Sequence, residues 1–119
     1  MFTSEKRAKF RKGLDGVRFK SLAHGEKTHL CVFHLDKGAV IPAHKHPHEQ
    51  TGYQVSGRMK FLLGKKAFVV EPGSSWTIAG NVEHGVKALE DCVVIEVFSP
   101  RRKDYLDRTS RRRKEAHEI

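Results

Sequence analysis

Residues 53–63 read YQVSGRMKFLL, and this stretch decides the fold class. Apolar side chains occupy odd positions from Tyr53 to Leu63, and polar side chains occupy even positions from Gln54 to Lys60. Alternation with a period of two is typical of strands that bury one face. Gly57 interrupts the run as a turn residue would. The stretch therefore predicts a pair of strands with the odd-numbered side chains buried.

Similar short runs lie on both sides of this stretch and are separated by turn residues. The runs are 29–35, 39–41, 67–70, 75–78, 84–88 and 92–98, and the turns include Asp36-Lys37-Gly38, Pro72-Gly73, Gly80-Asn81 and Glu90-Asp91. Short strands with turn signals every 8–12 residues or so are typical of an all-β sandwich or barrel. A chain of 119 residues is long enough for one such domain.

The formal net charge of +9 lies entirely in the two ends of the chain. Residues 21–100 carry eight basic and eight acidic side chains. Residues 3–12 and 107–119 have a helix-forming composition without an apolar stripe, which predicts basic end segments that are surface helices or disordered. Arg111-Arg112-Arg113-Lys114 keeps nucleic-acid binding open as an alternative, although such runs are usually solvated and no aromatic stacking pattern accompanies this one.

Other protein classes find no support in the sequence. No apolar run approaches the roughly 20 residues of a membrane span, and the charged N-terminus lacks the apolar core of a signal peptide. Cys31 and Cys92 are too few for a disulfide scaffold and too far apart for a CxxC site. We therefore expect buried free thiols in a cytoplasmic protein.

Residues 44–50 read HKHPHEQ and carry the densest chemistry in the chain. On a strand, His44 and His46 project from one face and can converge on one ion. Gln50 shares their parity and is favoured as a further ligand over Glu49, but the intervening proline leaves Glu49 open. His84 is available as a third imidazole. The sequence thus predicts a metal site, with solvated surface histidines as the alternative and His48 as the weakest ligand candidate.

The parity of this cluster conflicts with that of the stretch that follows it. Gln50 is even-numbered, whereas the apolar residues from Tyr53 onward are odd-numbered. If both sets face inward, the strand must change register between them. We expect this change at Thr51-Gly52, through a bend or bulge.

These residues resemble the two motifs of the cupin superfamily. Gly38-(x)5-His44-x-His46-(x)3-Gln50-(x)6-Gly57 is similar to the first motif, G(X)5HXH(X)3–4E(X)6G, with Gln where most members have Glu. Pro72-Gly73-(x)10-His84 is similar to the second, with Ala79 in place of its usual proline. The resemblance implies a cupin-type β-barrel or jelly roll over 17–106, flanked by basic segments 1–16 and 107–119. It also implies one bound metal and a homodimer.

Within the cupins, HxHPHEQ together with Phe98-Ser99-Pro100-x-Arg102-x-Asp104-Tyr105-Leu106 is similar to the pectin-degradation cupins. That subgroup opens the ring of 4,5-unsaturated uronates to linear keto acids. The resemblance implies metal ligation by His44, His46, Gln50 and His84, a catalytic Glu96, a catalytic and substrate-binding Arg102, and a substrate-binding Phe98. Glu96 stands where the subgroup has Asp.

The residues alone leave several of these roles open. Glu96 interrupts an apolar strand, so it either faces water or is retained for a function. Without the family resemblance, Arg102 would be interpreted as a solvated cation next to Arg101 and Lys103. Three imidazoles and a carboxamide would leave the full +2 charge on Ni, Zn, Mn, Fe or Cu, a good receptor for a small anionic sugar. The alternatives are a mononuclear iron dioxygenase and a non-catalytic module that binds metal or sugar.

Overall fold

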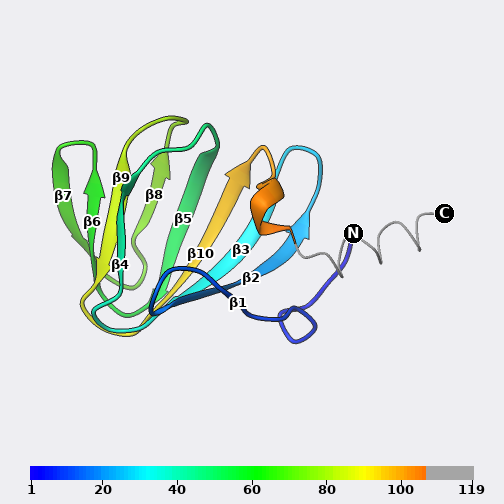
Figure 1. The fold of residues 1–119 in the computed structure, drawn as a ribbon, viewed down its shortest axis with the longest axis horizontal. Helices are drawn as coiled ribbons and strands as arrows, with labels where there is room; N and C mark the ends of the chain where they lie inside the picture. Colours follow the sequence, from blue (N-terminus) through cyan, green and yellow to red (C-terminus); the bar gives the residue numbers. More distant parts are fainter. Residues whose placement is uncertain (107–119) are drawn as a thin grey trace.

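The computed structural model describes residues 1–106, and the expectations for 107–119, including the basic run at 111–114, lie outside the described residues. Two antiparallel sheets face each other across the core (Figure 1). The larger has the strand order β1-β2-β3-β10-β5-β8 and the smaller the order β4-β9-β6-β7. The strands are β1 (Arg11–Lys12), β2 (Val17–His24), β3 (His29–Leu35), β4 (Val40–His44), β5 (Glu49–Ser56), β6 (Met59–Leu63), β7 (Lys66–Val70), β8 (Ser75–Ile78), β9 (His84–Ala88) and β10 (Cys92–Ser99). The all-β fold is confirmed.

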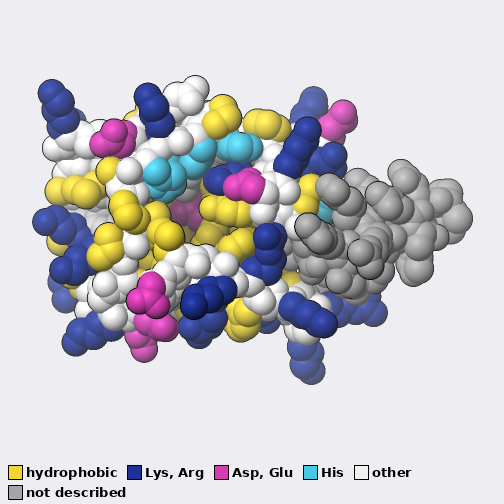
Figure 2. Space-filling model, viewed as in Figure 1, with side chains coloured by type: hydrophobic (Ala, Val, Ile, Leu, Met, Phe, Trp, Pro, Cys, Tyr) yellow, Lys and Arg dark blue, Asp and Glu magenta, His cyan; other side chains and the backbone are white. Residues whose placement is uncertain are grey.

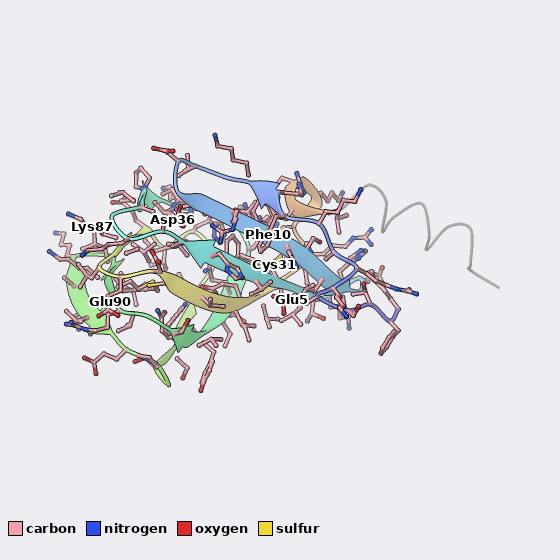
Figure 3. The ribbon with its side chains drawn as sticks, turned by 90° about the horizontal axis from the view of Figure 1, so that it is seen from below. Glu5, Phe10, Cys31, Asp36, Lys87 and Glu90 are labelled. Carbon is pink, nitrogen blue, oxygen red and sulfur yellow. The ribbon has the colours of Figure 1, made fainter. Side chains whose placement is uncertain are left out.

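The N-terminal segment is neither the surface helix nor the disordered segment that its composition suggested. The chain makes a turn at residues 5–7 and then forms β1, which pairs with β2. Phe10 packs edge-on against His34 and lies beneath the charged groups of Arg18 and Lys20, so this segment lies against β2 and β3, as Figure 3 shows for Phe10. These tertiary contacts outweigh a weak local helix preference.

The strand pair at residues 53–63 exists, but only half of it buries its odd-numbered side chains. In β6, Met59 and Phe61 are buried as expected. In β5 the inward residues are even-numbered, and Tyr53 is 48% exposed while Gln54 is completely buried. No register change occurs at Thr51-Gly52, because Gln50, Gly52 and Gln54 all face inward. The shift lies instead at the end of β5, where Val93 and Val94 of β10 pair with Ser56 and Gln54 and skip Val55.

Gly57 allows the parity to change between β5 and β6. Its φ of 78° lies in the left-handed region, and a Cβ at this position would lie 2.1 Å from the carbonyl oxygen of Asp91. The Gln54 side chain donates hydrogen bonds to the carbonyls of Ser56 and Gly57 and so supports the turn from within. The turn predicted at Gly57 is therefore confirmed, although the strand before it faces the other way.

The hydrophobic core fills the space between the sheets. Its buried members come from both sheets and include Leu35, Met59, Phe61, Ile78 and Val94. Cys31 and Cys92 are free and buried, as expected. In the described part of the chain no helix is long and apolar enough to cross a membrane.

Candidate functional site

Three histidines converge where the smaller sheet borders the cavity between the sheets. His44 ends β4 and pairs directly with His84, the first residue of β9. His46 follows β4, and its ring centroid lies 5.6 Å from that of His44 and 4.9 Å from that of His84. One nitrogen from each ring lies within 4.8 Å of the others. The convergence predicted from the sequence is confirmed, and the three side chains could hold a metal ion.

Two of these imidazoles are oriented by the backbone. Nδ1 of His44 lies 3.0 Å from the carbonyl of Pro42, and Nδ1 of His84 lies 2.8 Å from that of Val82. Because a carbonyl oxygen only accepts, each Nδ1 carries the proton and donates it. The lone pair of each ring is then on Nε2, as a metal ligand requires.

The environment keeps His46 in the form that binds metals. Burial, aided by the nearby Arg102 guanidinium, lowers the pKa of His46 to about 4. Burial likewise lowers the pKa of His84. Neutral imidazoles near neutral pH have a lone pair to donate to a cation.

Between the two candidates for a fourth ligand, Gln50 is buried and Glu49 is exposed. Gln50 projects inward from β5 toward His46. Its Oε1 is buried and makes no hydrogen bond with the described residues. A buried acceptor without a donor is costly, and a divalent cation among the three histidines would satisfy it. The residues present therefore fit a metal ion.

Glu96 faces the cavity and not the solvent. Its carboxyl group projects inward from β10, and the residue is 7% exposed. Burial raises the pKa of Glu96 to about 8, and hydrogen bonds from Gln50 and Trp76 moderate the rise. Trp76 Nε1 donates to Oε1 at 3.2 Å, while Oε2 is buried without a partner in the described chain. The group is thus a protonated acid near neutral pH with one oxygen available to a ligand.

Arg102 is buried against aromatic rings, so it is not a solvated cation. Its exposed fraction is 8%, and its guanidinium lies over the rings of Phe98 at 5.0 Å and Tyr105 at 4.1 Å. Nε and Nη2 donate to the two carboxylate oxygens of Asp104 at 3.1 and 2.8 Å. Burial opposes ionisation of Asp104, but Arg102 outweighs it and holds the pKa of that carboxyl below its usual range.

One cavity unites all of these groups. It contains about 560 Å³ of empty space, counted out into the open solvent at its mouth. Apolar side chains line most of it, and the polar groups are His44, His46, Gln50, His84, Glu96, Arg102 and Tyr105. Figure 2 shows the hollow, with histidine side chains along one side and hydrophobic side chains within it. An apolar pocket with a few converging polar groups suits an oriented polar ligand.

The cupin domain matches residues 31–98, more than half of the chain. The chain belongs to the cupin family. Among curated proteins, "Pectin degradation protein KdgF" of Dickeya dadantii is 31% identical over 94 residues, which cover 77% of this cupin and 86% of that protein.

Solved structures agree with this assignment. KdgF from a Halomonas species superposes on this cupin with a TM-score of 0.84 and 32% identity, over 89% of this chain and 98% of that one. An RmlC-like cupin from Shewanella frigidimarina also has a TM-score of 0.84, with 25% identity over 88% and 95% of the two chains. The likeness to KdgF thus extends over almost the whole described domain.

Two features of the cupin's site had no sequence signal of their own. Trp76, Gly52 and Glu96 lie in one row across β8, β5 and β10. A Cβ on Gly52 would lie 2.3 Å from Trp76 Nε1, so the absence of a side chain lets the indole cross β5 and reach Glu96. Asp104 belongs to the family pattern at residues 98–106, but only the three-dimensional structure shows that it pairs with Arg102.

Proposed function

We propose that this cupin binds a divalent transition metal and converts 4,5-unsaturated uronates to linear keto acids. The observation that carries the proposal is the meeting of the histidine cluster, a buried carboxyl group and a buried arginine in one cavity. The pectin-degradation name of a 31% identical relative supports a uronate as the ligand. The partner is accordingly a small anionic sugar.

The metal would be held by His44, His46, His84 and Gln50. Three neutral imidazoles and a neutral carboxamide leave the whole +2 charge for an oxygen of the sugar. When bound, the ion supplies Lewis acidity. Nitrogen and oxygen donors of this kind suit Ni, Zn, Mn, Fe or Cu.

Arg102 would bind the uronate carboxylate. Asp104 already takes the edge of the guanidinium formed by Nε and Nη2. A ligand carboxylate would therefore approach Nη1 and the remaining hydrogen of Nη2, which form a second two-donor edge. Phe98 packs against both Arg102 and His46 and would contact the sugar between them.

Glu96 would carry the proton of the reaction, and Oε2 is the oxygen that would do so. The conversion is an isomerisation in which the anomeric hydroxyl loses a proton and becomes the C1 aldehyde, the bond from C1 to the ring oxygen breaks to leave an enolate, and C4 of that enolate gains a proton as C5 becomes a ketone. No oxidant is needed. Trp76 occupies Oε1 of Glu96, so Oε2 is left to exchange a proton with the sugar.

The decisive experiment mixes the metal-analysed protein with 4,5-unsaturated galacturonate and follows the loss of its enol-ether ultraviolet absorbance. We expect the wild type to exceed His46→Ala by about 100-fold or more. The His48→Ala variant is a matched control with a ring beside the cluster, and we expect it to stay near the wild-type rate. A wild type no faster than His46→Ala would refute the proposal.

Oxygen uptake with iron-loaded protein would favour the dioxygenase alternative instead, and uronate binding without turnover would favour the non-catalytic module.

We further infer a cytoplasmic homodimer. Its support is the outer face of the larger sheet, where Tyr53 and Ile95 are directly paired neighbours that are 48% and 36% exposed. Val55, on the same side of β5, is 43% exposed. Light scattering with size-exclusion chromatography should give twice the chain mass for the wild type and a shift toward the chain mass for Ile95→Lys. A wild type at the chain mass would rule the dimer out.

A further inference from the structure

His29 lies in the β3 strand, is completely buried and does not line the cavity. Even so, it contacts the segment that carries Arg102. Its Nδ1 lies 3.1 Å from the backbone nitrogen of Arg102, and its Nε2 lies 2.7 Å from Ser21 Oγ on β2. The imidazole therefore connects the larger sheet with the chain that follows β10.

The partners of His29 determine its tautomer. A backbone N–H can only donate, so Nδ1 must accept from Arg102 with its lone pair. Nε2 then carries the proton and donates it to Ser21 Oγ. Burial, aided by the nearby His24 and Arg102, lowers the pKa of His29 to about 4, in keeping with this neutral ring.

The Arg102 side chain touches the larger sheet through the ring of Phe98 on β10, a contact with little directionality. Further along the segment, Arg11 of β1 donates hydrogen bonds to the carbonyls of Asp104 and Leu106. Asp104 accepts hydrogen bonds from the guanidinium, but it belongs to the same short segment as Arg102 and would move together with Arg102. Tyr105, which stacks against the guanidinium, packs on Phe19 and Phe33 of the larger sheet through ring contacts that have little directionality. The hydrogen bond to His29 is directional and acts on the backbone of Arg102 itself.

We propose that His29 is a positioning residue that holds Arg102 at the place where it receives the carboxylate of an anionic sugar. The proposal rests on the proposed function for the identity of that carboxylate. The hydrogen bond from Arg102 to His29 is independent of it. Losing the Nδ1 acceptor would leave the N–H of Arg102 buried without a partner, and the segment would move away from the sheet to satisfy it.

The test uses His29→Leu, which removes the acceptor, and His29→Asn, whose Oδ1 replaces Nδ1. For 4,5-unsaturated galacturonate we expect His29→Leu to raise KM about tenfold with a smaller change in kcat, and His29→Asn to restore KM to within about threefold of the wild type. In an Arg102→Ala background, His29→Leu should raise KM no further. Val32→Ala, a buried position on the same strand, should lower thermal stability without raising KM.

A second measurement needs no substrate. In the wild type, hydrogen exchange of the Arg102 backbone N–H, followed by nitrogen-15 NMR, should be slow because His29 Nδ1 accepts that hydrogen. We expect faster exchange in His29→Leu and recovery in His29→Asn. Unchanged exchange together with unchanged KM in His29→Leu would overturn the positioning role. If the wild type neither binds nor converts uronates, the proposed function fails, and the exchange rates alone then decide the role of His29.

Discussion

At the scale of single residues, the charge of Gln50 matters as much as its position. The carboxamide is buried beside His46 and close enough to Glu96 to lower the pKa of that carboxyl group against the effect of burial. A carboxylate at position 50 would cancel one unit of charge on a bound metal and repel the anion that the cavity is proposed to receive. The amide thus offers an oxygen ligand without this electrostatic cost.

The Gln50→Glu variant tests this reasoning. Metal retention during chelator dialysis should equal or exceed that of the wild type, because a charged oxygen binds a cation more strongly. KM for the unsaturated uronate should rise about tenfold, since the net charge facing the carboxylate falls. Metal analysis and initial-rate kinetics on the same preparations provide the two measurements. A lower KM would contradict the argument from charge.

Two substitutions of Glu96 separate the effect of its side-chain length from the effect of its ability to exchange a proton. Glu96→Gln keeps the shape of the side chain but cannot exchange a proton, so kcat should fall by about 10²–10⁴-fold. Glu96→Asp keeps the acid and shortens its reach by one methylene, and its kcat should lie between those of the other two proteins. The ultraviolet assay measures all three. Equal rates for wild type and Glu96→Gln would remove Glu96 from proton transfer.

At the scale of secondary structure, β5 joins the metal cluster to the carboxyl group. Gln50 faces the histidines from this strand. Gly52 has no side chain, so the indole of Trp76 can cross the strand and donate a hydrogen bond to Glu96. Two different parts of the site therefore depend on the position of one strand. A small change in β5 should affect both.

The Gly52→Ala variant should break the bond between Trp76 and Glu96, because the new Cβ would overlap the indole. Trp76 is the only tryptophan of the chain, so its fluorescence reports the change directly. We expect a red-shifted emission and a loss of turnover of about tenfold or more. The matched control is Gly25→Ala, where a Cβ would meet nothing within 4 Å. Unaltered emission from Gly52→Ala would show that the indole accommodates the new Cβ without being displaced, which would contradict the prediction.

The strands of the fold could largely be predicted from the sequence, because turn residues such as Pro72-Gly73 and Gly80-Asn81 lie between them. The inward face of β5 could not. Its apolar side chains, Tyr53 and Val55, point outward, and polarity normally marks the solvent side. β2 was missed, although Val17 and Phe19 alternate with basic residues in the manner of a strand.

The candidate site was predictable where local spacing carries the chemistry. His44 and His46 share a face because strands alternate, His84 was available as a third imidazole, and the family resemblance added roles for Glu96 and Arg102. The supporting residues were not predictable in this way. Trp76 and His29 act on partners 20 and 73 positions away in the chain, and such pairings are set by strand order and not by spacing.

At the scale of the whole molecule, buried neutral histidines tie stability to pH. The pKa of His29 falls from 6.5 to about 4 on folding, so between these values the unfolded chain binds more protons than the folded one. Stability should therefore be full above pH 6.5 and decrease as the pH falls toward 4. The loss from this one residue is at most about 3 kcal/mol.

Urea unfolding of metal-free protein at about pH 7 and about pH 4.5 measures this dependence. The difference between the two unfolding free energies should be smaller in His29→Asn than in the wild type, since Asn does not titrate. The other charged or titratable groups near the imidazole are His24, Cys31, Arg101, Arg102 and Asp104, and both proteins contain all of them. Equal differences in both would show that His29 does not link folding to pH.

The inverted polarity of β5 has a consequence for how the chain finds its fold. A slip of one residue would turn Tyr53 and Val55 into the cavity and expel Gln50 and Gln54. That mispaired strand would bury more apolar surface and so compete with the native arrangement. Only in the native pairing does Gly52 lie opposite Trp76, where any larger residue would collide with the indole. The lack of a side chain at position 52, which lets Trp76 reach Glu96, thus also favours the native pairing of β5. It does so through steric exclusion, whereas burial of apolar surface alone would favour the mispaired strand.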